Sequence, residues 1–364
     1  MKVEGLVAMV TGGGSGMGRD LVVQLAKAGC HVAFCDVSQA GIDETVKLAQ
    51  ATARKGIRVM GGKVDVTDRE GLQRFAEEVV SKNNDKLHLL FANAGIASHG
   101  PLIHDANATA EQIASKEREW DRCFEIDFFG VLYTLRAFLP HIVRQDKGYV
   151  VVTSSVNGFW TWPEHSCYTA AKFGVRGLTE SLLVETYAKA PHVQVACVHP
   201  GGVRTNIVRN STFAKNKEGK TSDITGDFDK IAGLSSAEAA EWILDGVARD
   251  HTRILVGYDA VLWDKMNRLS PHGGYKVFGA LGREGIAQWD PTRASENIVQ
   301  AKKVSLLGWL RFLKDGGLFF LIFSAPATAM NLIRQLTGAS ASQVLTLSAI
   351  LALVKLQRSS RSRI

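Results

Sequence analysis

The sequence predicts a doubly wound α/β fold, a parallel sheet of about seven strands with helices on both faces, and two observations support this class. Short apolar runs alternate with amphipathic stretches through residues 1–258, which is typical of βαβ units. Most of the runs lack polar alternation, as in strands that are buried on both faces. The alternation ends there, so we expect one domain over 1–258 and a hydrophobic, mainly helical extension over 259–364.

The predicted strands are continuous runs of Val, Ile, Leu, Ala and Phe, and they cover residues 6–11, 31–36, 57–65, 87–93, 148–155, 193–200 and 253–257. Apolar residues recur at helical spacing between these runs. The spacing predicts helices over 17–29, 39–55, 68–82, 119–145, 168–188 and 236–249.

Composition and charge narrow the class of protein. Of the 364 residues, 46% are hydrophobic and 22% are charged, which suits a globular protein with a sizeable core. The net charge is +7, and five of these charges follow the last acidic residue, Asp315; they belong to Arg334, Lys355, Arg358, Arg361 and Arg363. This excess of positive charge near the C-terminus indicates that the segment binds an anionic surface rather than nucleic acid.

The five cysteines show no CxxC spacing and no nearby histidine pairing, so we expect reduced, mostly buried thiols and no metal site; they are Cys30, Cys35, Cys123, Cys167 and Cys197. The first residues lead directly into a predicted strand, without the pattern of a secretory signal. We therefore expect an intracellular protein that is cytoplasmic or bound peripherally to a membrane.

A glycine-rich turn, VTGGGSGMG, follows the first strand and opens the first helix. Its glycines Gly12, Gly16 and Gly18 have the spacing G-x-x-x-G-x-G. Glycines at such a turn let the backbone approach a pyrophosphate, which then lies at the helix N-terminus. The strand–turn–helix setting therefore predicts dinucleotide binding.

Asp36 ends the second strand, 20 residues after Gly16. A carboxylate at this place accepts hydrogen bonds from the adenosine ribose. It also repels a 2′-phosphate, and the next residues, Val37 and Ser38, supply no cation to hold one. The sequence therefore favours NAD(H) over NADP(H).

The stretch CYTAAKFG places Tyr168 and Lys172 four residues apart, on one face of a helix. A nearby ammonium stabilises a phenolate, and a lowered tyrosine pKa makes the phenol a better proton donor or acceptor at neutral pH. The spacing alone is equally compatible with a solvated helix face, so the remaining motifs have to decide.

Together these motifs resemble the short-chain dehydrogenase/reductase family in its classical form, over residues 1 to about 258. TGGGSGMG matches the family's glycine motif, Asp65–Val66 its adenine-contacting pair, ANAG its sheet-steadying segment, SSVNG and YTAAK its active site, and HPGGVRT the segment that borders the nicotinamide. The resemblance implies a Rossmann-type fold, a homodimer or homotetramer, and cofactor contacts from Gly12, Gly14, Ser15, Gly16, Met17, Gly18, Asp36, Asp65, Val66, Asn93, Ala94, Gly95, Tyr168, Lys172, Pro200, Gly201, Val203 and Thr205.

Carried over residue by residue, the resemblance makes Tyr168 the general acid/base of an alcohol/ketone oxidoreductase. Lys172 would lower the tyrosine pKa and bind the nicotinamide ribose. Ser155, 13 residues before Tyr168, would hold the substrate oxygen, and its neighbour Ser154 is the weaker candidate. Two hydroxyl donors aimed at a carbonyl stabilise the oxyanion that develops there.

Asp127 departs from the family pattern, which has Asn in N-x-x-G where this chain reads FEIDFFG. In the family the backbone carbonyl of this residue holds a water next to the lysine, and Asp keeps that carbonyl. We expect turnover to be retained but slowed. Two alternatives remain: Asp127 only caps or pairs locally, or the chain is a non-catalytic dinucleotide-binding or membrane-associated scaffold protein.

Phe159, Trp160 and Trp162 follow Ser155 and suit a bulky lipophilic substrate, such as a steroid, an isoprenoid or a long-chain keto compound. Packing in the core or at a subunit interface is the equal alternative. The polar segment 205–235 is long enough to be a lid, with Ile207 and Phe213 as contacts, and His99 and His165 are placed to titrate near the site.

The tail contains two uncharged runs of 18 and 20 residues, 316–333 and 335–354. Both approach the length of a membrane span, but polar residues interrupt them. They suit helices that lie on a membrane, with the terminal cations at anionic headgroups. Packing on the domain or on a partner subunit is the alternative, and the final SRI resembles a peroxisomal address only weakly.

Overall fold

The computed structural model describes residues 3–98, 100–104, 106–162, 165–205, 207, 233–269 and 275. Most of the expected lid, including Phe213, and nearly all of the expected extension lie outside these residues, as does His99. The expectations of a membrane-binding tail and a peroxisomal address therefore concern residues outside the described part.

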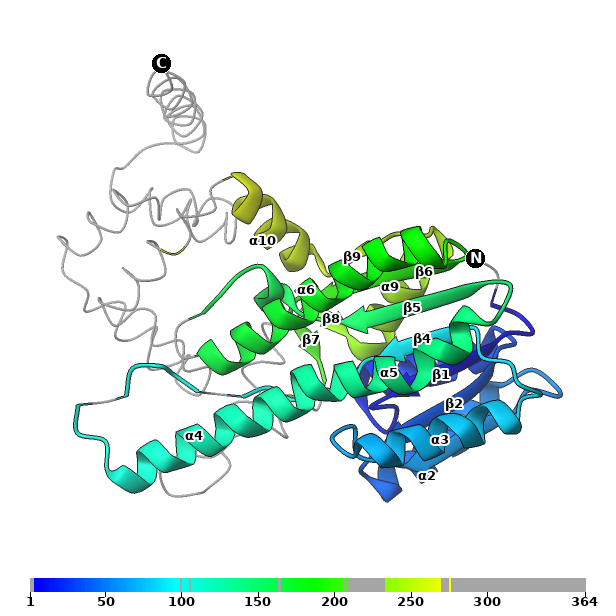
Figure 1. Ribbon diagram of the computed structural model, residues 1–364, viewed down its shortest axis with the longest axis horizontal. Helices are drawn as coiled ribbons and strands as arrows, with labels where there is room; N and C mark the ends of the chain where they lie inside the picture. The colour runs from blue at the N-terminus through cyan, green and yellow to red at the C-terminus, as the bar shows by residue number, and fades with distance from the viewer. Residues whose placement is uncertain are drawn as a thin grey trace, which may run out of the picture. The chain divides into compact units, whose positions relative to one another are not determined.

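Seven parallel strands form one sheet in the order β3-β2-β1-β4-β5-β6-β9 (Figure 1). The strands are β1 Val7–Thr11, β2 His31–Asp36, β3 Val59–Lys63, β4 Leu89–Ala92, β5 Gly148–Thr153, β6 Val193–Pro200 and β9 Arg253–Val256. All seven predicted strands are confirmed. A second, two-stranded pairing joins β7 Val203–Arg204 to β8 Leu234–Ser235.

Helices cover both faces of the sheet because successive residues of each strand point in opposite directions. In β1, Ala8 and Val10 pack with α1 Gly16–Lys27, α2 Gln39–Thr52 and α9 Ser236–Ala248. Val7 and Met9 pack on the other face with α3 Arg69–Ser81, α5 Gly130–Val143 and α6 Ser166–Lys189. The predicted doubly wound, Rossmann-type fold is thus confirmed.

The helix expected over 119–145 is longer and less regular than predicted. It consists of α4 Ala110–Phe124, the π-helical segment η1 Glu125–Phe129, and α5. Thr109 and Gln112 form a capping box that starts α4. A π segment inside a helix often marks a functional site, and this one contains Asp127.

The 3₁₀ turn η2 Val156–Gly158, which follows Ser155, was not expected. Helix α10 Tyr258–Leu269 follows β9 and covers the start of the extension that was expected to be mainly helical. Trp263 of α10 packs against Trp160, with ring centroids 5.0 Å apart. The first compact unit includes Met1–Leu269, so a boundary at 258 would cut α10 from the sheet on which it packs.

A search of the described residues for membrane-spanning helices finds Ala110–Val143, which is long and apolar enough by length and composition. Its α5 part packs into the core layer that also contains α3 and α6. Because a buried core helix can have the same length and hydropathy, this helix is weak evidence for a membrane span.

Candidate active site

A cleft of about 380 Å³ opens beside the carboxyl end of β1. The chain runs from β1 outward to β2 and β3, and then returns to β4 on the other side of β1. Open α/β sheets bind ligands at such a switch point. The lining of this cofactor cleft is Gly12, Ser15, Gly16, Met17, Gly18, Cys35, Asp36, Val37, Val64, Asp65, Val66, Asn93, Ala94, Gly95, Ile96, Arg122, Ile126, Thr205 and Ile207.

The turn between β1 and α1 is shaped to receive an anion. Gly12 has φ +68°, a left-handed conformation that glycine adopts readily. A Cβ on Gly18 would lie 2.1 Å from the carbonyl oxygen of Gly12, so no larger residue fits there. The first turn of α1 contains no acidic residue, and Ser15 makes no capping bond to it. The positive end of the helix therefore faces the cleft unopposed.

Asp36 closes the far side of this turn. One carboxylate oxygen accepts from the backbone N–H of Gly14 at 2.9 Å, and the other accepts from that of Ser38 at 2.9 Å. Each oxygen keeps a further lone pair for a ribose hydroxyl. Among the described lining residues Arg122 is the single cation, and it lies on α4 rather than beside Asp36.

Thr11 and Asn93 join the ends of β1 and β4 below the cleft. The Thr11 hydroxyl accepts from the backbone N–H of Asn93 at 3.0 Å and of Ala94 at 3.1 Å. The Asn93 amide donates to the Thr11 carbonyl at 3.2 Å, whereas its own oxygen is buried without a partner. Buried acceptors rarely stay unpaired in proteins, so this oxygen next to the cleft suits a ligand hydroxyl.

The residues expected to be catalytic come from the turn after β5, from η1 and from α6, and we call Ser155, Tyr168, Lys172 and Asp127 the catalytic cluster. The Lys172 amine lies 5.4 Å from the centre of the Tyr168 ring. The Ser155 side chain lies close enough to Tyr168 to lower the pKa of its hydroxyl. The Ser154 hydroxyl is used elsewhere, because it donates to the backbone carbonyl of Lys172 at 2.9 Å.

Asp127 forms a buried ion pair with Lys172, their Oδ1 and Nζ atoms being 2.9 Å apart and the side chains 0% and 3% exposed. The same oxygen accepts from the backbone N–H of Ile96 at 3.2 Å. A Cβ on Gly95 would lie 2.5 Å from this oxygen, so glycine leaves the room that the pair occupies. Since Gly95 and Ile96 line the cofactor cleft, the pair adjoins it directly.

Burial and charge set the protonation of this cluster. Burial raises the pKa of Tyr168, the charge of Lys172 lowers it, and the charge of Asp127 raises it again, with the result above the ordinary value. Burial lowers the pKa of Lys172, but Asp127 and Tyr168 raise it, and the net shift is upward. Lys172 does lower the tyrosine pKa, as expected, but burial and Asp127 outweigh it here.

Twelve of the predicted cofactor residues line the cleft, and six do not: Gly14, Tyr168, Lys172, Pro200, Gly201 and Val203. Gly14 is the backbone partner of Asp36. Pro200 ends β6, and Val203 is buried in β7. Sequence reasoning missed six lining residues, Cys35, Val37, Val64, Ile96, Arg122 and Ile126. The first four are next to predicted residues in the sequence, and helical continuity from Asp127 brings Arg122 and Ile126 to the same edge.

The three aromatic residues after Ser155 belong largely to the core. Phe159 and Trp160 are each 1% exposed. Phe159 packs on His199, and both Trp160 and Trp162 pack on Trp263. The alternative of core packing therefore holds for Phe159 and Trp160, and Trp162 alone of the three keeps partial exposure. Among the described residues no group of His, Cys, Asp and Glu could hold a metal ion.

The chain is similar in sequence to known oxidoreductases. A family model described as short chain dehydrogenase matches residues 6–216. A Mycobacterium tuberculosis protein that bears the name oxidoreductase SadH is 36% identical over 289 residues, covering 79% of this chain and 98% of that protein.

Solved structures give the same result. A short-chain dehydrogenase/reductase from Burkholderia phymatum in complex with NAD has a TM-score of 0.63 at 25% identity, covering 75% of this chain and 96% of its own. Carveol dehydrogenase from Mycobacterium avium, also with NAD, has a TM-score of 0.60 at 25% identity, covering 72% and 99%. NADP is the bound cofactor in another similar structure.

Proposed function

The chain belongs to the short-chain dehydrogenase family, and from this premise we propose that it interconverts a secondary alcohol and a ketone with NAD(H). The buried contact of Lys172 with both Tyr168 and Asp127, next to the cleft, is the observation that carries the proposal. A lysine and a carboxylate are rarely fully buried unless they serve a pair or a site.

The cleft fits a nicotinamide dinucleotide. The glycine turn and the N-terminus of α1 suit the pyrophosphate, Asp36 suits the adenosine ribose, and the orphan oxygen of Asn93 suits a hydroxyl of the second ribose. One oxygen of the Asp65 carboxylate accepts from the backbone N–H and the hydroxyl of Thr67, and neither of these bonds uses the second oxygen, which suits the adenine amino group beside Val66. When bound, the cofactor supplies or removes the hydride.

The catalytic cluster handles one proton and the substrate oxygen. With its raised pKa, Tyr168 is protonated at neutral pH and donates to the oxygen of a ketone that is being reduced. Ser155, which lies close enough to Tyr168 to influence its pKa, directs a second donor at the same oxygen. Lys172 keeps its proton because Asp127 holds it, and its charge stabilises the phenolate left after the transfer.

Asp36 supports NAD(H) as the preferred cofactor. Its carboxylate lies where a 2′-phosphate would be, and the Arg19 guanidinium nearby is engaged by Glu44 at 2.7 Å and by the Gly14 carbonyl. A phosphate would therefore meet an anion without a free cation beside Asp36.

We propose a bulky lipophilic alcohol or ketone as the substrate, and the similarity to a carveol dehydrogenase suggests a cyclic one. The test is reduction of NAD⁺, and separately of NADP⁺, with trans-carveol and with a panel of acyclic secondary alcohols. Turnover with NAD⁺ and a cyclic alcohol supports the proposal. Tight NADH binding without turnover on any alcohol or ketone favours the alternative, a non-catalytic dinucleotide-binding protein.

The role of Asp36 in cofactor preference can be tested against a matched control. Asp36→Asn removes the charge that repels a 2′-phosphate, so the preference for NAD⁺ over NADP⁺ should narrow. Asp43→Asn changes an exposed carboxylate on α2 that pairs with Gln39, and it should leave the preference unchanged. If both variants show the same ratio of activity with NAD⁺ to activity with NADP⁺, Asp36 does not determine the cofactor preference.

We also propose a homodimer or homotetramer. Apolar side chains are exposed along η1, α5 and α6, and they are Phe129, Val143, Phe173, Val184 and Tyr187. Figure 1 shows α5 and α6 running beside each other on this face. Sedimentation equilibrium should give two or four times the chain mass of 39.5 kDa, and a monomer would contradict this.

Finally, we propose that residues 259–364 contact an anionic membrane surface, supported by their uncharged runs and terminal cations. Full-length protein should float with phosphatidylserine-containing vesicles and less with vesicles of phosphatidylcholine alone. Absence of flotation with both would leave the alternative, packing on protein.

A further inference from the structure

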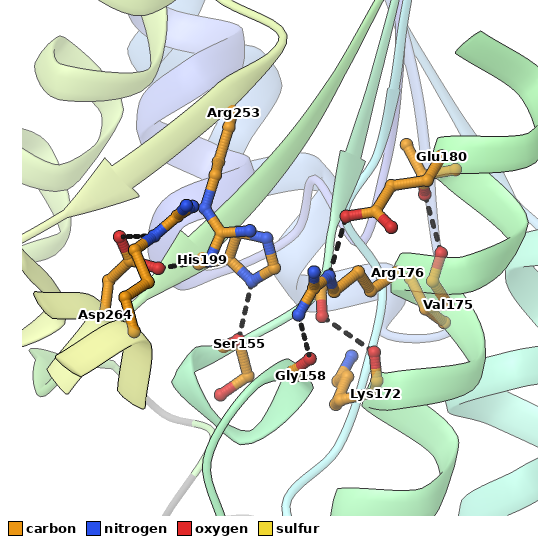
Figure 2. Close-up of polar contacts among 12 residues, drawn as sticks. Ser155, Gly158, Lys172, Val175, Arg176, Glu180, His199, Arg253 and Asp264 are labelled. Atoms are coloured by element: carbon orange, nitrogen blue, oxygen red, sulfur yellow. Dashed lines mark hydrogen bonds and ion pairs between the residues drawn. The ribbon is translucent and has the colours of Figure 1, made fainter. Parts of the chain in front are cut away.

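A histidine that the proposed mechanism does not use lies directly behind Ser155. His199 is 0% exposed and sits one residue before the end of β6. Its Nδ1 atom is 2.8 Å from the backbone carbonyl oxygen of Ser155 (Figure 2). This hydrogen bond joins β6, the strand that contains the first residues of HPGGVRT, to Ser155, which supplies the second hydroxyl of the catalytic cluster.

This contact fixes the tautomer of the histidine. A carbonyl oxygen only accepts, so Nδ1 carries the hydrogen and donates it. Nε2 is then a bare acceptor, and it is buried without a partner. Burial and the nearby cations lower the pKa of His199 to about 4, so the ring is neutral in the physiological range.

The groups around the ring agree with a neutral histidine. Arg253 of β9 and Arg176 of α6 both lie close enough to disfavour a charged ring, and Asp264 of α10 is already paired with Arg253. Phe159 presents its ring at 5.1 Å and 63° to the imidazole. The imidazole is therefore held on several sides, with Nδ1 as its one donor.

The carbonyl of Ser155 has two donors, and only one of them belongs to its own turn. Gly158 N–H donates at 2.9 Å and closes η2, while His199 donates from the sheet. The Ser155 hydroxyl is held in turn by the Asn157 N–H at 3.2 Å. Without His199 the turn bond would persist, but the peptide after Ser155 would lose the contact that fixes it to β6.

We propose that His199 is a positioning residue for the reaction: its Nδ1–H holds the Ser155 carbonyl and so sets the direction of the Ser155 hydroxyl toward the substrate oxygen and Tyr168. The inference rests on the proposed function, because it needs a reaction in which Ser155 takes part. It assigns the histidine of HPGG a role at Ser155, across the β5–β6 pairing.

Three substitutions at this position separate positioning from packing. In His199→Asn the amide nitrogen is attached to Cγ, as Nδ1 is, and can donate to the same carbonyl. In His199→Gln the nitrogen is one bond further out, at the place of Nε2. His199→Leu fills the space and donates nothing. The assay is NAD⁺ reduction with trans-carveol, together with NADH affinity by fluorescence and thermal stability.

His199→Asn should keep kcat within a few-fold of the wild-type value. The Gln and Leu variants should lower kcat by on the order of 10²-fold, because a small misplacement of a reacting group slows a reaction by that factor. NADH affinity should stay similar in all three, because the cofactor cleft is not lined by His199. Nitrogen NMR of the wild type should show one tautomer, protonated at Nδ1, at neutral pH.

If the wild type turns over trans-carveol and His199→Leu is equally active, the inference is overturned and the proposed function stays intact. Equal losses in Asn, Gln and Leu, with parallel losses of NADH binding, would assign His199 a packing role instead. A histidine protonated at Nε2 in the NMR spectrum would also overturn it. If wild type and Tyr168→Phe are both inactive toward every alcohol and ketone, the proposed function fails, and this inference fails with it.

Discussion

The cofactor cleft and the catalytic cluster share one edge of the sheet, yet they are built from different groups. The part of the cleft suited to the pyrophosphate and the adenosine ribose presents glycines, a helix N-terminus and Asp36, from residues 12–18 and 36 that are close in sequence. The cluster consists of side chains from the turn after β5, from η1 and from α6, and two of them are buried charges.

This difference predicts two kinds of response to mutation. A change in the cleft acts through steric fit, because a backbone cradle tolerates no added atoms, and it should affect cofactor binding first. A change in the cluster acts through charge and proton position, so it should affect stability, turnover and pH dependence while the cofactor still binds. The following predictions test that separation, from the largest expected effect to the smallest.

Lys172→Ala should have the largest effect, because it leaves the Asp127 carboxylate buried without a partner. Breaking a buried pair on one side costs about 3–5 kcal/mol of unfolding free energy. Denaturant unfolding measures this loss, and the second change Asp127→Asn should restore part of it. Lys82→Ala removes an exposed lysine whose Glu78 pair is also exposed, and it should cost less than about 1 kcal/mol.

His199 should make the fold sensitive to acid. Its folded pKa of about 4 lies below its ordinary 6.5, so the unfolded chain binds a proton in this range and the folded chain does not. The stability contribution is complete above pH 6.5 and falls by about 3 kcal/mol as the pH approaches 4. His199→Asn should flatten this slope, and His251→Asn, an exposed control, should not. An unchanged slope in His199→Asn would refute the assignment.

Gly18→Ala should weaken NADH binding by about 10- to 100-fold, since overpacking costs about 1–3 kcal/mol. The added Cβ would meet the Gly12 carbonyl and the Asn93 amide. Gly177→Ala is the matched control, because its Cβ would meet nothing within 4 Å in the middle of α6. It should bind NADH normally and gain helix stability. Equal NADH affinity of the two variants would contradict the close approach of Gly18 to the Gly12 carbonyl in this turn.

Asp127→Asn should shift the pH profile of alcohol oxidation toward lower pH. Burial raises the pKa of Tyr168, and the Asp127 charge adds to that increase. Removing this charge lowers the tyrosine pKa, so the phenolate that accepts the alcohol proton forms at lower pH. The control is Asp121→Asn on the exposed face of α4. A shift toward higher pH would show that Asp127 acts through something other than its charge.

Much of the fold and of the cleft could be predicted because the signals are local. The strands are apolar runs, and the glycine turn with Asp36 spans only residues 12–36. The start of α4 was misplaced because its first turns are polar and lack apolar periodicity. The Thr109–Gln112 capping box was the signal that would have placed it.

The contacts that could not be predicted join residues far apart in sequence. The Asp127–Lys172 pair and the His199–Ser155 bond each depend on how separate elements pack. Asp127 stood out only as a departure from a family pattern, and its ion pair needs the π segment and the glycine at 95. The role of α10 was missed because residues beyond 258 no longer follow the strand–helix alternation.

The most direct test of the separation between cleft and cluster is Tyr168→Phe, measured for NADH binding and for turnover with the alcohol that wild type oxidises best. The variant removes one hydroxyl from the cluster, and Tyr168 does not line the cleft. NADH affinity equal to wild type with turnover reduced at least ~10²-fold is the predicted result, in line with the loss of a general acid/base. Turnover equal to wild type, or NADH affinity lost together with turnover, would contradict it.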